Sequence, residues 1–150
     1  MTIPLSRPAT LAALLLSAAF CSTPAWAQTT VSAGWVRGTV AQQKATGAFM
    51  QIRSVQGGRL LSVSSPLAEV AEIHEMKMSG DVMKMAPVAG LDLPAGRAVE
   101  LKPGGYHLML MGLKQTLNDG DSVPMSLVVQ SADGKKETVD LKLPVRGLGK

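Results

Sequence analysis

The chain has 150 residues, with 15 lysines and arginines against 11 acidic residues and a formal net charge of +4. This length suffices for one hydrophobic core and predicts one domain. The basic residues are scattered, and Lys135 and Lys136 are their only adjacent pair. We therefore expect no nucleic-acid partner, because a nucleic-acid surface needs clustered positive charge.

Residues 1–27 have the pattern of a cleaved export signal. Arg7 is their only charged residue, residues 11–20 form an apolar run, and Ala25 and Ala27 are small residues before the expected cleavage point. The run is too short for a permanent membrane anchor, so we expect no stable membrane insertion. The expected mature domain is 28–150, in the periplasm. Without Arg7 it has 14 basic and 11 acidic residues, a net charge of +3.

The single cysteine, Cys21, lies inside this segment. The mature chain would therefore contain no disulfide, no thiolate metal site and no catalytic thiol. Lipid attachment at Cys21 is the alternative to cleavage after Ala27. It is disfavoured because the preceding residue is Phe20, where a lipid-attachment site requires a small side chain.

The mature chain has the pattern of an all-β protein, a sandwich or barrel of short strands separated by turn residues about every ten positions. No segment has a sustained 3.6-residue apolar period, although 65–70 could form one helical turn. The end of the chain, 145–150, is expected to be loose. The expected strands are 31–37, 47–53, 59–64, 70–78, 82–88, 97–101, 107–111, 122–130 and 136–144.

The most informative pattern is His74, Met85, His107 and Met109, in the spacing His-x10-Met-x21-His-x-Met. The chain contains only two histidines, and both belong to it. With Gly80 and Asp81 as a two-residue hairpin loop, Met76 would lie opposite Met85. His74 and Met85 would then be diagonal neighbours on one face. His107 and Met109 also share a face, so the two pairs could converge on one ion.

Imidazole with thioether is a soft, uncharged set of ligands that suits Cu(I). Zinc is disfavoured because thioether is a poor ligand for it, and a blue-copper site would need a cysteine thiolate. Four neutral ligands leave the ion its full charge, which favours holding copper without trapping it. Acidification should weaken binding, because only neutral imidazole coordinates a metal.

Core packing is the alternative explanation for single residues of this pattern, because methionine commonly fills gaps in cores. Met50 and Met125 are expected in the core. Glu72 and Glu75 flank His74 and are expected on a solvated surface. With both histidines assigned to the metal, no catalytic triad can be assembled, and we expect no enzyme. Four further methionines could rim the site, guide an ion or pack the core: Met76, Met78, Met83 and Met111.

Segments 74–76, 82–85 and 101–113 resemble the core signature of the PCuAC family of periplasmic copper chaperones. The resemblance extends from about Trp35 to Val145. It implies a cupredoxin-like Greek-key β-sandwich that binds one Cu(I) per chain near one end. The family's ligands match His74, Met85, His107 and Met109 here. Some members carry a His/Met-rich C-terminal tail with a second site, and 143–150 contains no such residue.

We expect a monomer, and the resemblance also implies its function. It would deliver copper to the dinuclear copper centre of cytochrome c oxidase, to a thiol-bearing assembly protein, or to both. The rival hypothesis is a copper buffer or resistance protein that sequesters Cu(I). One four-ligand site favours transfer, because a sequestering protein more often carries many Met/His clusters.

Overall fold

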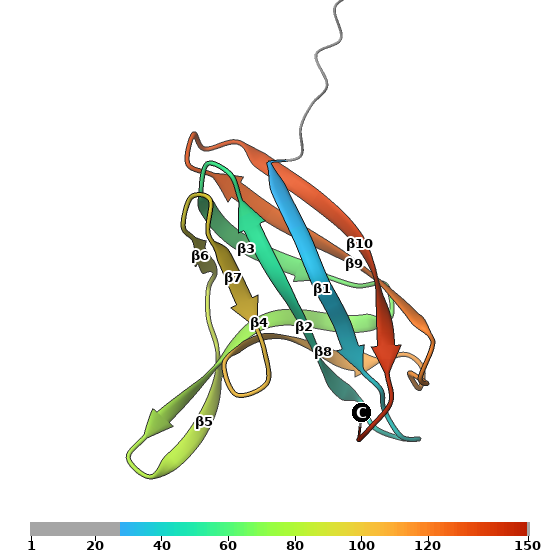
Figure 1. The fold of residues 1–150 in the computed structure, drawn as a ribbon. Helices are drawn as coiled ribbons and strands as arrows, with labels where there is room; N and C mark the ends of the chain where they lie inside the picture. The colour runs from blue at the N-terminus through green and yellow to red at the C-terminus, as the bar shows by residue number, and fades with distance from the viewer. Residues whose placement is uncertain (1–27, 150) are drawn as a thin grey trace, which may run out of the picture.

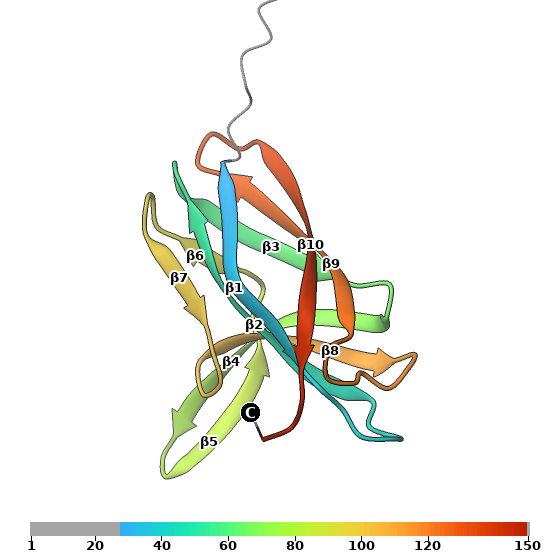
Figure 2. The ribbon, with the colours of Figure 1, turned by 45° about the vertical axis from the view of Figure 1, so that its right-hand side comes forward.

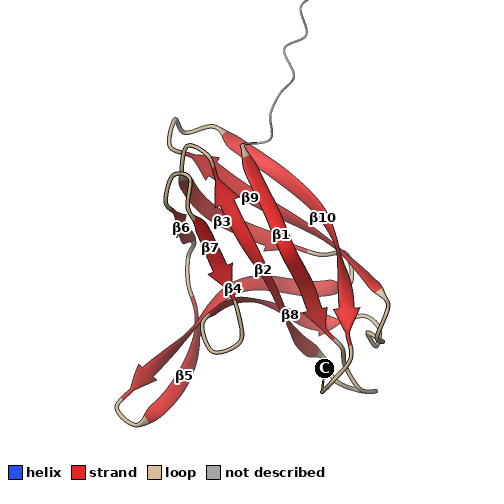
Figure 3. Ribbon diagram, in the orientation of Figure 1, coloured by secondary structure: helices blue, strands red, loops and turns tan. Residues whose placement is uncertain are grey.

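The computed structural model describes residues 28–149, which form ten β-strands and no helix (Figure 3). The described part of the chain thus contains no helix that could span a membrane. The predicted export signal, 1–27, lies outside the described residues. The strands are β1 (Thr29–Arg37), β2 (Ala45–Ser54), β3 (Gly58–Ser64), β4 (Ala68–Ser79), β5 (Val82–Pro87), β6 (Leu91–Leu93), β7 (Ala98–Leu101), β8 (Tyr106–Leu113), β9 (Ser122–Ser131) and β10 (Lys136–Arg146).

The strands form a sandwich of two sheets (Figures 1 and 2). One sheet has the order β5-β4-β8-β2-β1, with β7 also paired to β2, and the other has the order β10-β9-β3-β6. A short parallel pairing of Val36 and Arg37 with Val145 and Arg146 joins the two sheets between β1 and β10. All other pairings are antiparallel among the described residues, which confirms the predicted all-β architecture.

Alternating side chains of both sheets fill the core between them, as expected for strands with one buried face. Met50 and Met125 belong to this core, as predicted. Strands β4 and β8 contribute Ile73, Leu108 and Leu110 to the core. Because side chains alternate along a strand, the residues adjacent to these three in sequence lie on the outer face of the sheet. That outer face is where the predicted metal-binding residues lie.

All nine predicted strands are present, and the structure corrects three details. The short strand β6 was not predicted. Residues 65–70 form no helical turn, because the chain turns at Ser65, whose carbonyl accepts a hydrogen bond from the Ala68 amide, and enters β4 directly. The end of the chain is not loose from residue 145, because Val145 is buried and pairs with β1.

Candidate metal centre

The two histidines lie side by side on neighbouring strands. The antiparallel register of β4 and β8 places His74 directly opposite His107, and their ring centroids are 5.8 Å apart. Both are buried, with 8% and 5% of their surface exposed. Buried polar side chains of this kind require partners for their polar atoms.

Each ring has one nitrogen held by a hydrogen bond. In the neutral form of His107, Nδ1–H donates to the Gly105 carbonyl oxygen at 3.1 Å, which leaves Nε2 as the free lone pair. His74 Nε2–H donates to the Glu72 carboxylate at 2.9 Å. Its other nitrogen, Nδ1, is buried with no hydrogen-bond partner. Each ring thus has one nitrogen available to a metal ion.

The two predicted methionines lie on either side of this histidine pair. Met85 on β5 is opposite Met76 on β4, which confirms the predicted hairpin register. Met109 on β8 is opposite Glu72 on β4 and Gly47 on β2. A cavity of about 320 Å³ brings three predicted residues together, and His74 lies beside it against His107. Its lining is Arg37, Gln43, Ala45, Thr46, Gly47, Phe49, Met76, Met85, Pro103, Gly104, His107 and Met109.

Phe49 borders the site on the β2 side. Its ring centroid is 6.4 Å from that of His107 and 4.6 Å from that of Trp35, and the Arg37 guanidinium lies 5.4 Å from the Phe49 centroid. A Cβ on Gly47 would come within 2.9 Å of the Phe49 ring, so the absence of a side chain lets this ring cover β2. The apolar edge limits water access to the imidazoles, which strengthens their interaction with a cation.

Sequence reasoning missed one contact of Glu72, whose side chain is 42% exposed, as expected for a solvated surface, and is also hydrogen-bonded to His74. A signal was present, because residues two apart on a strand share a face.

Glu75 lies on the other face, as expected. There it pairs with Lys77 at 3.2 Å. A hydrogen bond to Glu75, with a smaller contribution from burial, raises the pKa of the Tyr106 hydroxyl above its usual value of 10.

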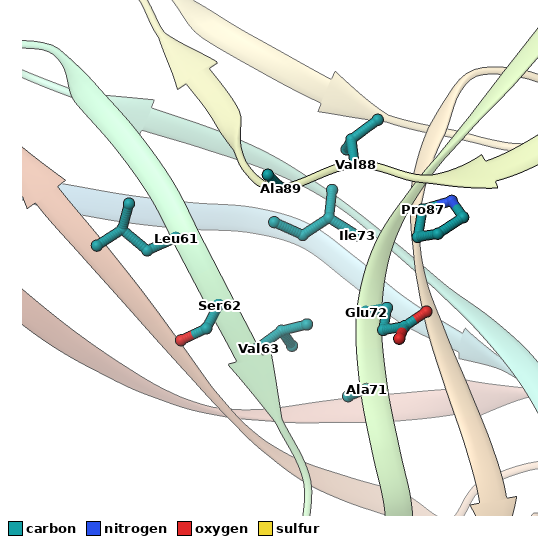
Figure 4. A pocket seen from close by; sticks show the side chains of 9 residues that line it. All are labelled: Leu61, Ser62, Val63, Ala71, Glu72, Ile73, Pro87, Val88 and Ala89. Carbon is teal, nitrogen blue, oxygen red and sulfur yellow. The ribbon is translucent and has the colours of Figure 1, made fainter.

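A second hollow, of about 360 Å³, lies between β3, β4 and the segment after β5 (Figure 4). Its lining is largely apolar. Ile73 points toward Leu61, whereas the Glu72 carboxylate lies on the opposite side of β4. Among residues 28–149, no three His, Cys, Asp or Glu side chains form a metal-binding group. Within this part of the chain, a soft-metal site of three or more side chains therefore needs methionine.

Comparisons with known sequences found a matching family model and a similar protein. The family model described as "Putative lipoprotein LpqE-like" matches residues 29–145. A protein of Leifsonia xyli subsp. xyli, described as "Putative lipoprotein Lxx21020", is 34% identical over 159 residues, which cover 97% of this chain and 92% of that protein.

Two solved structures share the architecture. The Cu(I) form of DR1885 from Deinococcus radiodurans is 27% identical, with a TM-score of 0.63, covering 87% of this chain and 85% of that one. The copper-bound PCuAC domain from PmoF2 is 19% identical, with a TM-score of 0.60, covering 80% and 93%. The predicted cupredoxin-like sandwich is thereby confirmed.

Proposed function

Because this chain belongs to the LpqE-like family, and because two buried histidines meet beside a methionine-lined cavity, we propose that it is an exported metallochaperone whose cargo is Cu(I). The histidine pair is the main support for this proposal, since each ring keeps one nitrogen without a hydrogen-bond partner in the protein. Its role is binding and transfer of a metal ion, not catalysis.

The proposed ligands are His74, Met85, His107 and Met109. The separation of the imidazoles supports a shared ion. With a metal–nitrogen bond of about 2 Å, two rings on one ion have centroids no more than about 6.5 Å apart. The observed separation of 5.8 Å is within this limit. Thioethers from β5 and β8 border the same site, and soft sulfur with imidazole selects Cu(I).

The hydrogen bonds support one metal-binding nitrogen on each imidazole ring. His107 would bind through Nε2, because Nδ1 is held by the Gly105 carbonyl. His74 would bind through Nδ1, because Nε2 is held by Glu72. A carboxylate that accepts a hydrogen bond from a metal-binding imidazole fixes the ring and increases its basicity as a ligand. Glu72 is therefore proposed as a positioning residue for His74.

Relatives support copper as the cargo. DR1885, which has been solved in a Cu(I) form as well as in an apo form, is similar to this chain over most of its length. Family and relative are both described as lipoproteins, which supports export of this chain to the periplasm. We propose that the folded domain is 28–150, released by cleavage after Ala27. Intact mass of the exported protein tests this, since a lipid on Cys21 would give a larger mass and a chain that begins at Cys21.

The neutral, thiol-free set of proposed ligands supports delivery of the ion. Ligand exchange can move the ion to an acceptor while it remains Cu(I), since each thioether leaves as an acceptor ligand attaches. The proposed acceptor is the dinuclear copper centre of cytochrome c oxidase or a thiol-bearing assembly protein. The alternative function is sequestration by a copper buffer. A deletion strain separates the two, because delivery predicts low oxidase activity when copper is scarce and sequestration predicts poor growth when copper is in excess.

Anaerobic titration with Cu(I) against a competing chelator tests the binding proposal. One tight equivalent should bind to the mature chain, and His107→Ala and Met109→Leu should each weaken it. Met111→Leu is the matched control, since it makes the same chemical change on β8 outside the cavity lining. Binding no tighter than the chelator's, or binding unaffected by both site variants, would rule out this site.

A further inference from the structure

The hairpin of β4 and β5 exposes an unusual amount of apolar surface. Of the eight large hydrophobic side chains that are exposed in the described part of the chain, four lie where the two strands pair with each other, in residues 74–87: Met78 (59%), Val82 (59%), Met83 (46%) and Met85 (49%). The register places Met78 opposite Met83 and Met76 opposite Met85. Four methionines therefore form two cross-strand pairs, and these pairs share one face of the hairpin because they are two positions apart.

Packing does not account for these methionines. Strand β5 pairs only with β4, all six of its residues are exposed, and the hairpin projects beyond the rest of the sheets (Figures 1 and 2). The opposite face is mixed, with Lys77 opposite Lys84 and the exposed Val82 opposite Ser79. An exposed apolar edge strand favours aggregation, and strands prefer β-branched residues to methionine. Methionine differs from polar and β-branched residues in its thioether sulfur, so the sulfur atoms are the feature that would explain methionine at these positions.

The geometry suits a soft metal ion. Directly opposite residues in an antiparallel pair have Cβ atoms about 4.5–5.5 Å apart, and methionine side chains are long and flexible. Two or three thioethers can therefore reach one ion, and thioether favours Cu(I) over harder cations. Residues 28–149 contain no cysteine, so no thiolate of the described part of the chain competes with these thioethers.

We propose that Met78 and Met83 form an outer Cu(I) site, which takes up the ion from solvent and passes it inward. This proposal rests on the proposed function of the histidine site. The pair Met76 and Met85 lies one step nearer to that site, about 7 Å along the strands, and lines its cavity. In each step a thioether bond to copper breaks as an inner ligand bond forms, and the metal stays Cu(I). The inner site retains the ion because it adds two imidazoles.

Methyl-labelled methionine NMR, with Cu(I) as the probe, tests the outer site alone. In a His74→Ala/His107→Ala variant of the exported chain, Cu(I) should shift the Met78 and Met83 methyl signals, with weaker affinity than the wild-type inner site. Shifts confined to other methionines, or no shifts, would overturn the outer site. If the wild-type protein binds no Cu(I) that depends on His107, the proposed function fails. The methyl signals of the double variant still test the outer site independently.

Loading kinetics test the relay. The Met78→Leu/Met83→Leu variant should bind Cu(I) at the inner site with unchanged affinity. It should load from a weak chelator about tenfold more slowly, because no outer site then raises the local concentration of Cu(I) beside the inner site. Met111→Leu is the control and should load at the wild-type rate. Unchanged loading of the double hairpin variant would overturn the relay. The hairpin lies outside the core, so near-isosteric leucines should leave the fold intact.

Discussion

At the scale of single residues, the two histidines differ in which ring nitrogen is free. A backbone carbonyl holds His107 at Nδ1, whereas the Glu72 carboxylate holds His74 at Nε2. The carbonyl is part of the fold and survives any side-chain substitution. The carboxylate is a side chain on the same strand as His74, so its contribution can be removed by mutation.

Glu72→Gln should weaken Cu(I) binding by about 10- to 100-fold, the usual cost of losing an outer partner of a metal-binding histidine. The amide keeps the shape of the side chain but not the negative charge that increases imidazole basicity. Chelator competition measures the affinity. Glu75→Gln, on the opposite face of β4, is the matched control and should bind as wild type. Equal affinities for the two variants would show that Glu72 has no role in binding.

Gly47→Ala should destabilise the fold by about 1–3 kcal/mol, the usual cost of overpacking. The new Cβ would come within 2.9 Å of the Phe49 ring, which must then move. Urea unfolding gives the free energy of unfolding. Gly105→Ala is the control, because its Cβ would meet only Lys102 atoms at ordinary distances of 3.6 Å or more. A stable Gly47→Ala variant would mean that Phe49 adjusts without cost.

At the scale of elements, β4 has two faces with different chemistry. Glu72, His74 and Met76 face the proposed metal site, whereas Glu75 and Lys77 form an ion pair on the other face. Strand alternation produces this separation. Beside the second face, Tyr106 on β8 lies opposite Glu75. The two faces can therefore be tested independently.

Glu75→Gln should lower the pKa of Tyr106 toward its ordinary value, since the hydrogen bond to the Glu75 carboxylate is the largest cause of the raised pKa. Tyr106 is the only tyrosine in the chain, so the ultraviolet absorbance of the phenolate reports it alone. A raised folded-state pKa stabilises the fold below the unfolded-state pKa, and this stabilisation is lost as pH rises through the folded-state value. Wild type should therefore ionise at higher pH than the variant. Identical titration curves would contradict the hydrogen bond.

At the scale of the whole molecule, the proposed ligands all come from one sheet. Strands β4, β5 and β8 are consecutive in that sheet, and the second sheet supplies the other half of the core. The two sheets are joined where β1 pairs with the end of β10. Val145 is buried at this junction, with 2% of its surface exposed.

Truncation after Pro144 should destabilise the protein by at least about 1.5–3 kcal/mol, the value of burying one valine-sized side chain. It removes Val145 and the parallel pairing with β1. Urea unfolding measures the loss. Truncation after Arg146 keeps the junction and should cost less. Equal stabilities for the two truncated chains would show that this junction does not hold the sheets together.

Much of this fold follows from local sequence. The Gly80–Asp81 loop predicted that Met76 pairs with Met85. This two-residue loop has the pattern of a type II′ turn, with Gly80 at a φ of 64° in the first central position, and such a turn fixes the register of the hairpin. The three-residue strand β6 is too short to show a periodicity. The interaction of Glu72 with His74 was also missed. The sequence shows that the two residues share a face of the strand, but it does not show that His74 is buried and therefore requires a hydrogen-bond partner.

The sequence by itself determined which donor atoms the chain can offer, where nine of the ten strands of residues 28–149 lie, and which residues share a face, because side-chain chemistry and strand alternation are local properties. Only the tertiary structure decided that His74 meets His107, which is remote in sequence. That contact depends on pairing β4 with β8, and the pairing is favoured by burial of Ile73 and Leu108 in a core that both sheets complete. Non-local pairing reflects the packing of the whole molecule, which no short segment contains.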